Sequence, residues 1–342
     1  MKFTAIAAAA LIQLVNAASL VEVLTTAKES TLLSLVGTEP EILKALATFK
    51  GTVFAPTDAA LAATVAAGFN ATDLAALANV LSYHIAPGAG FSGANFTGAA
   101  FLTTSQGNEV KAFGSAEGVQ IQSGFGTPLA NVVSTLPFDG GFVHIVDQTL
   151  IPPANIVEVA KAAGLNSLLS ALTSAGLAET VSKLSGVTIL APTDAAFAAV
   201  ADVVKTLTPD QLKTVLLSHV VPGTVHSIDI VAAKSLPSVA TSAAGSNLKV
   251  SYDGTDVLIS GGANTTPAKV AIADVFADKV LVHVIDAVLI PDFKAIAAAP
   301  VSATAAKTAT ATATAVASAT PKSGAMQIVG AASALVASFL LL

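Results

Sequence analysis

Histidine is the residue type of this chain best suited to do chemistry. Four of its five histidines stand in two matching pairs of motifs, His84 with His219 and His144 with His283. An imidazole near neutral pH can ligate a metal or carry a proton. The fifth, His226, has no counterpart, and we expect it in a solvated loop.

The four paired histidines lie in apolar surroundings. Val80 precedes His84 by one helical turn, and Val143 and Ile145 flank His144. A buried imidazole is costly to charge, so it should stay neutral, with one ring nitrogen donating and the other accepting. We therefore predict a structural role for all four, with metal ligation and acid-base catalysis as the alternatives.

The carboxylates near these histidines do not suggest a metal site. Zinc requires three or four ligands, whereas His144 and Asp147 lie on one strand, where their side chains point apart. His283 and Asp286 repeat this spacing. We assign all four residues to a structural motif and expect no metal or cofactor.

Two Thr-Asp pairs are the other candidates for chemistry, Thr57-Asp58 and Thr193-Asp194. Each follows a short apolar strand and precedes an alanine-rich run, where a Thr or Asp oxygen accepts from the free amides of a helix. A helix cap is therefore the favoured interpretation, and a catalytic carboxylate is the alternative.

Motifs of common enzyme classes are missing from the sequence. The chain has no Cys and no Gly-x-Ser-x-Gly turn to present a nucleophile. Gly140-Gly141 is not followed by the Lys and Ser or Thr of a phosphate-binding loop. We predict that the protein is not an enzyme.

These residues belong to a duplicated unit. The phrase Ala-Pro-Thr-Asp-Ala-Ala begins at Ala55 and again at Ala191, and the histidine motifs follow it in the same order both times. A duplication of this size indicates two domains, each long enough to bury its own core. We place them at residues 18–153 and 154–293.

The sequence of each unit predicts helices in its first half and mainly strands in its second half. Thr208-Pro209-Asp210-Gln211 predicts a capped helix start, and Asp253-Gly254 predicts a hairpin. Both faces of the strand 142–146 are apolar apart from His144, so this strand should be central and covered on both sides. Further strands are expected at 109–113, 119–122, 248–252, 257–259, 268–272 and 280–285.

The two ends of the sequence resemble processing signals. Residues 1–17 combine Lys2, an apolar run and small residues, as in a secretory signal peptide. Residues 294–323 form a stalk rich in Ala, Ser and Thr, and residues 324–342 an apolar tail typical of lipid-anchor attachment. Candidate attachment residues for a glycosylphosphatidylinositol anchor are Ser323, Gly324 and Ser318, and a simple tail anchor is the alternative.

Composition narrows the choice of partners. The net charge is -6, and all 16 basic residues are lysines without a basic cluster, so nucleic acid is not an expected partner. Three sequons provide candidate glycosylation sites, at Asn70, Asn95 and Asn264. They fit a secreted glycoprotein.

Taken together, the motifs resemble the fasciclin domain family. The resemblance rests in each unit on the strand ending in Thr-Asp, the Tyr83-His84 motif or its Ser218-His219 equivalent, and the segment 143–152 or 282–291. It implies an α+β fold in which each domain is a wedge-shaped β-sandwich of about seven strands with packed helices. It also implies an extracellular, non-enzymatic protein of the fungal, lipid-anchored type.

The resemblance points to adhesion as the function. Tyr83, His84 and His219 are candidate adhesion residues, with weaker support in the second unit because Ser218 replaces the tyrosine. Expected partners are cell-surface or cell-wall components, protein or polysaccharide, or a second copy of the chain, with the outer leaflet of the plasma membrane holding the anchor. The alternative is a module that binds wall polysaccharide or a small apolar ligand in a pocket between helices and sheet.

Overall fold

The computed structural model describes residues 18–27, 48–88, 90–93, 98–116, 118–243 and 246–293. The expected signal peptide, the whole stalk, the anchor tail with its attachment residues, and Asn95 lie outside these ranges. We refer to residues 18–153 as repeat 1 and to residues 154–293 as repeat 2. None of the described helices is both long and apolar enough to span a membrane.

In its described part, repeat 1 forms a seven-stranded sheet in the order β2-β1-β7-β6-β5-β4-β3. The strands are β1 (Gly51–Pro56), β2 (Ile85–Pro87), β3 (Ala99–Thr103), β4 (Glu109–Ser115), β5 (Gly118–Gln122), β6 (Ala130–Phe138) and β7 (Gly141–Val146). Strands β1 and β7 run parallel, while the other neighbours pair antiparallel.

Repeat 2 has the same topology, in the order β10-β11-β12-β13-β14-β8-β9. Its strands are β8 (Val187–Pro192), β9 (Val220–Pro222), β10 (Ser235–Ala240), β11 (Asn247–Tyr252), β12 (Val257–Gly261), β13 (Ala268–Ala277) and β14 (Val280–Ile285). The parallel pair is β8 with β14. The two repeats therefore share one α+β fold, as the motifs indicated.

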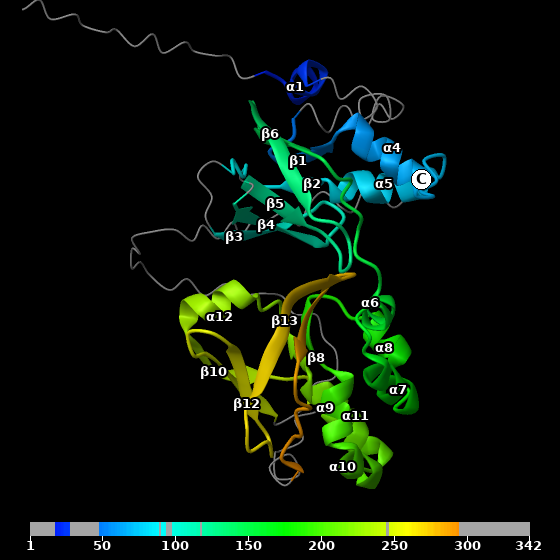
Figure 1. Ribbon diagram of the computed structural model, residues 1–342, viewed down its shortest axis with the longest axis vertical. Helices are drawn as coiled ribbons and strands as arrows, with labels where there is room; N and C mark the ends of the chain where they lie inside the picture. Colours follow the sequence, from blue (N-terminus) through cyan, green and yellow to red (C-terminus); the bar gives the residue numbers. More distant parts are fainter. Residues whose placement is uncertain are drawn as a thin grey trace, which may run out of the picture.

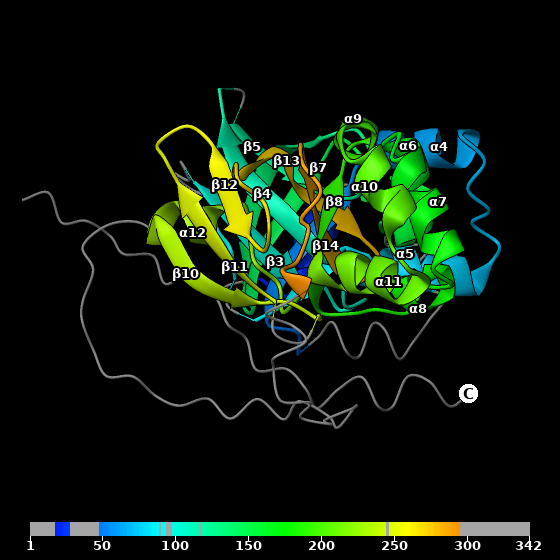
Figure 2. The same cartoon turned by 90° about the horizontal axis from the view of Figure 1, so that it is seen from below.

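Most helices of both repeats lie on the same side of the molecule, but α1 (Leu20–Thr26) lies at the top of Figure 1 and α12 (Ser227–Ala233) lies on the opposite side (Figures 1 and 2). Repeat 1 has α1 (Leu20–Thr26), α4 (Asp58–Ala66) and α5 (Leu74–Tyr83) in its described part. Repeat 2 has α6 (Ile156–Ala162), α7 (Asn166–Ser174), α8 (Ala178–Ser182), α9 (Asp194–Ala199), α10 (Ala201–Thr206), α11 (Pro209–Ser218) and α12 (Ser227–Ala233).

The helix starts follow from local sequence. Thr57 and Thr193 cap α4 and α9 by accepting from Ala60 N and Ala196 N, both at 3.2 Å. Thr208 and Gln211 form a capping box at the start of α11, with Pro209 in its first turn. The repeated Thr-Asp motif is therefore a helix start in both repeats.

The parallel strand pair forms the centre of each repeat. Every residue of β1 and of β14 is buried, and β7 is buried from Val143 to Val146. A strand buried on both faces can stay apolar in both alternate sets of side chains. This explains why the sequence around His144 and His283 lacks the alternation of an exposed strand.

The remaining strands were harder to recognise. The sequence did not predict β2, β3, β6, β9 or β10, and it ended β13 five residues too early, at Ile272. Both β6 and β13 contain register shifts, between Val132 and Ser134 and between Val270 and Val275. Such bulges disrupt the period of two by which strands are recognised.

The two repeats stack end to end along the long axis of the molecule (Figure 1). The β3–β4 end of repeat 1 faces β13 and the N-terminal side of α12 in repeat 2, where several side chains make direct contacts. The short link through Pro152 and Pro153 therefore joins two domains that are in close contact.

Candidate functional site

His84 joins the end of α5 to the segment that follows β7. Its Nδ1 lies 2.7 Å from the carbonyl oxygen of Val80, and its Nε2 accepts a hydrogen bond from Leu150 N at 2.9 Å. The side chain is buried, and burial lowers its pKa to about 4. His84 is therefore a neutral imidazole whose two ring nitrogens are both used by the fold.

His219 makes the same connection in repeat 2. Its Nδ1 lies 2.7 Å from Val215 O, and its Nε2 accepts from Leu289 N at 2.9 Å. Burial again lowers the pKa to about 4. Because the geometry is the same in both repeats, the histidine fills a structural role of the fold itself.

His144 and His283 fix a second connection, from the central strand to the loop before β3 or the segment before α12. Nε2 of His144 bonds Phe91 O at 2.7 Å, and Nε2 of His283 bonds Val225 O at 2.8 Å. The Nδ1 partners are the Thr135 hydroxyl in repeat 1 and the Asp274 amide in repeat 2. Burial lowers the pKa of both imidazoles.

The residues predicted to mediate adhesion lie inside the domains. Tyr83 is 0 % exposed and donates its hydroxyl to Glu109 O at 3.0 Å, while His84 and His219 are each 3 % exposed. Ser218, in place of the tyrosine, donates to Val215 O at 2.6 Å. These side chains cannot touch a partner while the domain is folded. The prediction that they mediate adhesion directly is therefore wrong, and their role is in the core.

The carboxylates of the repeated motifs also bond to the fold. Asp194 accepts from Ser167 N at 2.8 Å, which caps the neighbouring helix α7 and lowers the pKa of its carboxyl. Asp147 and Asp286 accept from Asn131 N and Lys269 N, both at 2.7 Å. In the part of the chain that the structure describes, no three His, Asp or Glu side chains converge as metal ligands.

The described sequons differ in their surroundings. Asn70 is exposed, and its side-chain oxygen accepts from the hydroxyl of Thr72 at 2.7 Å. Asn264 is partly buried, with its side-chain nitrogen donating to Val288 O and its oxygen accepting from Ile290 N, both at 2.8 Å. Asn264 already links two segments of repeat 2, so Asn70 is the better candidate for a glycan.

The contact between the repeats holds the chain's most deeply buried ion pair among the described residues. Asp274 has a fully buried side chain and accepts from Lys111 Nζ of repeat 1 at 2.8 Å. Ser227 adds hydrogen bonds from its amide at 2.9 Å and its hydroxyl at 2.5 Å. Burial alone raises the pKa of this carboxyl, but Lys111 and Ser227 outweigh burial and hold the pKa below its usual value.

His226 lies in this contact, which corrects the expectation of a solvated loop. Its Nε2 lies 2.8 Å from Glu109 Oε2 of repeat 1, and its ring stacks on Phe101 with centroids 3.7 Å apart. Burial lowers its pKa, but Glu109 and Asp229 outweigh burial and raise the pKa overall. The stability that the His226–Glu109 pair adds is therefore fully present in mild acid. It is lost as the pH rises through the pKa of His226 in the folded protein.

Asn108 completes the contact. Its side-chain nitrogen donates to Asp278 Oδ1 at 3.0 Å, and its oxygen accepts from the amide of Lys279. We call Lys111, Asp274, Glu109, His226 and Asn108 the interdomain network. The sequence carried one signal of it, since Asp274 is a charged residue within the apolar run of β13.

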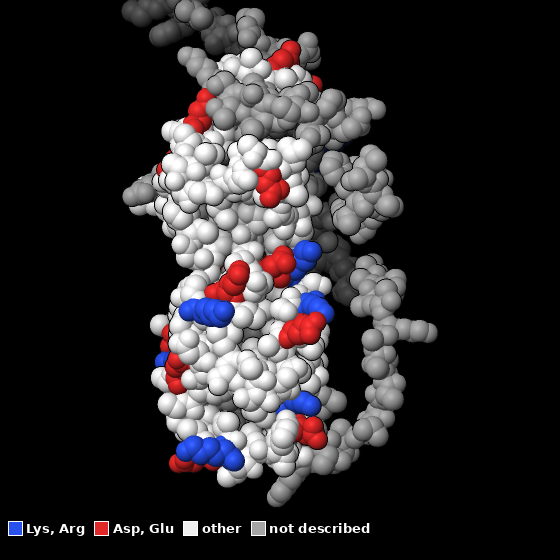
Figure 3. Space-filling model, turned by 90° about the vertical axis from the view of Figure 1, so that its right-hand side faces the viewer, with Lys and Arg blue, Asp and Glu red and all other residues white. Residues whose placement is uncertain are grey.

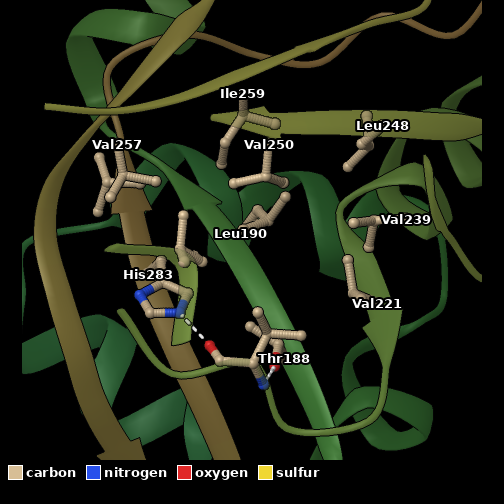
Figure 4. Close-up of a pocket in the computed structure, with 12 residues that line it drawn as sticks. Thr188, Leu190, Val221, Val239, Leu248, Val250, Val257, Ile259 and His283 are labelled. Atoms are coloured by element: carbon tan, nitrogen blue, oxygen red, sulfur yellow. Dashed lines mark hydrogen bonds between the residues drawn. The ribbon is translucent and has the colours of Figure 1, made fainter. Parts of the chain in front are cut away.

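Two hollows of the described structure are candidate binding sites. The first, in repeat 2, lies between α12 and the sheet and is lined mainly by apolar side chains, with His283 at its edge (Figure 4). Its volume is about 20 Å³, which holds little more than one water molecule. A small apolar ligand, expected between helices and sheet, does not fit there.

The second hollow opens between the repeats. It has a volume of about 290 Å³ and is lined by Thr103, Asn108 and Glu109 of repeat 1 and by Ser185, Thr224 and Lys279 of repeat 2, among others. We call it the interdomain cleft. It is the larger hollow and borders the interdomain network through Asn108 and Glu109.

A curled seven-stranded sheet flanked by helices, present twice and joined by a polar contact, defines a tandem α+β domain protein. The fasciclin domain model matches residues 8–152 and 163–291. Because these segments make up most of the sequence, the chain belongs to the fasciclin domain family.

Relatives of this chain include fungal proteins. It is 35 % identical over 112 residues to the fasciclin-like arabinogalactan protein CTB11 of Cercospora beticola, covering 33 % of this chain and 30 % of the relative. It is 34 % identical over 107 residues to the fasciclin-like arabinogalactan protein elcF of Phaeosphaeria nodorum, covering 31 % of this chain and 34 % of the relative. The chain thus spans about a third of the length of these curated relatives.

A solved structure also matches across both repeats. It is a FAS1 domain pair from the insect cell adhesion molecule fasciclin I, with 17 % identity and a TM-score of 0.39. The match covers 80 % of this chain and 99 % of the solved chain.

The neutral histidines predict a loss of stability in acid. Unfolded His84 and His219 gain protons below their ordinary pKa of about 6.5, whereas the folded imidazoles stay neutral down to about 4. The stability they contribute is present above about pH 6.5 and lost towards pH 4, by roughly 3 kcal/mol per histidine. Urea unfolding from pH 7.5 to 4 should show a shallower decline for His219→Gln than for the wild type, and equal slopes would contradict this.

The interdomain network predicts a large effect of a single lysine. Lys111→Met leaves the buried Asp274 carboxylate without its counter-charge and should lower the free energy of unfolding by roughly 3 kcal/mol. Lys249 occupies the corresponding position in β11 and is exposed, so Lys249→Met is the matched control with little expected effect. Adding Asp274→Asn to Lys111→Met should cost less than the sum of the two single changes in urea unfolding. Strict additivity would show that the pair does not interact.

Proposed function

We propose that this protein is a non-enzymatic adhesion or wall-organising glycoprotein of the cell surface, which acts through the outer surfaces of its fasciclin domains. The observation that carries the proposal is that the side chains best suited to do chemistry are already bonded within the fold. All four repeat-paired histidines use both ring nitrogens in bonds within the fold. The comparisons indicate no enzyme family.

The rigid contact between the domains supports this role. An adhesive protein must transmit force between its partner and its attachment point. The interdomain network joins the repeats by ion pairs, and the stacking of His226 on Phe101 adds to the contact. Figure 3 shows the helical side of the molecule, where charged side chains gather on repeat 2 and near the boundary, whereas the described surface of repeat 1 carries few. This described face of repeat 1 therefore suits partners that are not highly charged.

The proposal includes attachment to the outer leaflet of the plasma membrane. It rests on the sequence of residues 324–342 and of the stalk before them. The stalk would hold both domains away from the lipid surface, where they can meet wall components or a second copy of the chain.

Adhesion should depend on the folded surfaces and not on the buried motif. Beads coated with the full secreted chain should bind cell-wall extract or one another. Tyr83→Phe removes only the bond to Glu109 O, so binding per folded molecule should persist while stability falls by about 1 kcal/mol. Absence of any binding by the wild type would end the adhesion proposal, and loss of binding in a stable Tyr83→Phe variant would return the motif to a direct role.

Anchoring gives a separate test. A phosphatidylinositol-specific phospholipase should release the full-length protein from intact cells into the medium. The released protein should lack residues 328–342 by mass spectrometry. Retention at the surface together with detection of these residues in the mature protein would support a tail anchor instead.

A further inference from the structure

We infer that the interdomain cleft is a binding site for a neutral, polyhydroxylated ligand, the sugar units of a polysaccharide. This inference rests on the proposed function and names the chemistry of its partner. It goes beyond the family match, since the cleft is formed by the way these two repeats meet.

Four polar side chains of the cleft are not used by the fold. Within the part of the chain that the structure describes, the hydroxyls of Thr103, Ser185 and Thr224 make no hydrogen bond to protein, and the ammonium of Lys279 makes no ion pair. All four residues are exposed. Three hydroxyls and one ammonium from four separate segments therefore converge on one hollow, free to bond a ligand.

The floor of the cleft is apolar, in contrast to its rim. Phe276, Val280 and Leu281 line it and are 3 %, 5 % and 2 % exposed. At the rim Gly107 has a φ of +99°, and a side chain there would lie over the Lys279 stem. A sugar ring offers apolar C–H faces and a hydroxyl edge, which match such a floor and rim.

The charges of the cleft favour a neutral ligand over an ionic one. Its cation, Lys279, is offset by the carboxylate of Glu109, which also bonds His226 at 2.8 Å. A hydroxyl can accept from the ammonium and donate to the carboxylate, whereas a carboxylate or sulfate ligand would face Glu109 unfavourably. Hydroxyl groups therefore suit both sides of the cleft.

The walls of the cleft are held in place before any ligand arrives. Asn108 of repeat 1 binds both Asp278 and the Lys279 amide of repeat 2, so the Lys279 side of the cleft is fixed against the β3–β4 end. A site formed in advance loses less conformational freedom on binding. Because the ligand would contact both repeats, its binding should also stabilise their contact.

The test uses the full secreted chain and neutral glucose, mannose and galactose oligosaccharides of four to six units, with oligogalacturonate as an acidic comparison. Binding is measured by calorimetry and by NMR shifts of the cleft residues. We expect saturable binding of a neutral oligosaccharide and shifts centred on Thr103, Thr224 and Lys279. The absence of neutral binding, shifts located elsewhere, or stronger binding of oligogalacturonate would overturn the inference.

Substitutions locate the site. Thr224→Trp fills the cleft and should weaken binding by about tenfold or more, whereas Thr255→Trp, at the exposed β11–β12 turn, should leave it unchanged. Lys279→Met removes the free ammonium and should weaken binding, with the exposed Lys249→Met as its control. Ser185→Trp, from a different segment, serves if Thr224→Trp does not fold.

The outcomes separate this inference from the proposed function. If the wild type binds cell-wall extract and the cleft variants bind it equally well, the cleft is not the site, although the adhesion proposal stands. If the wild type binds neither extract nor its own copies, the proposed function itself fails. If Thr224→Trp loses both extract binding and oligosaccharide binding while Thr255→Trp keeps both, the result supports the proposed function and the cleft as its binding site.

Discussion

Burial of the central parallel strands on both faces is the constraint on which each repeat depends. Loops that cross the ends of these strands have amides and carbonyls that water cannot reach, and such groups must be paired within the protein. Imidazole suits this task because it is both donor and acceptor within one rigid ring. His84 and His219 each hold a helix end and a loop amide together, and His144 and His283 hold a loop carbonyl against a strand. The four paired histidines thus lie where buried backbone amides and carbonyls need a hydrogen-bond partner.

The repeats differ where they meet each other. Nδ1 of His144 is paired by the hydroxyl of Thr135, a residue that is exposed at the free end of repeat 1. At the corresponding place in repeat 2, Asp274 pairs its amide with His283 and turns its carboxylate to Lys111. Asp274 has a φ of +56°, an unusual conformation for a residue with a side chain, at one of the bulges of β13. The same internal bond is therefore kept, while the outward group has been adapted to the contact.

Much of the fold could be predicted from the sequence because the signals were local and occurred twice. The caps at Thr57 and Thr193 and the central strand at His144 depend on neighbours within a few residues. Strands β3, β6 and β10 were missed because bulges and mixed exposure hide their period, and β2 and β9 because three residues are too few to show one. The role of His226 depends on Phe101 and Glu109, more than a hundred residues away, and a single sequence gives no sign of such a contact.

The contact between the repeats also determines whether further domains can add to the pair by the same contact. It joins one end of a domain to the opposite end of the next, a head-to-tail arrangement that in identical units would continue as an open filament. Thr241 bonds Ser246 as Thr104 bonds Asn108, which aligns Lys111 with Lys249, Glu109 with Asn247 and Phe101 with Ser238. The outer end of repeat 2 thus lacks the ring and the carboxylate, and the outer end of repeat 1 has Thr135 in place of the buried aspartate. Polymerisation by this contact therefore stops after one step, and the pair is a closed unit with two dissimilar ends.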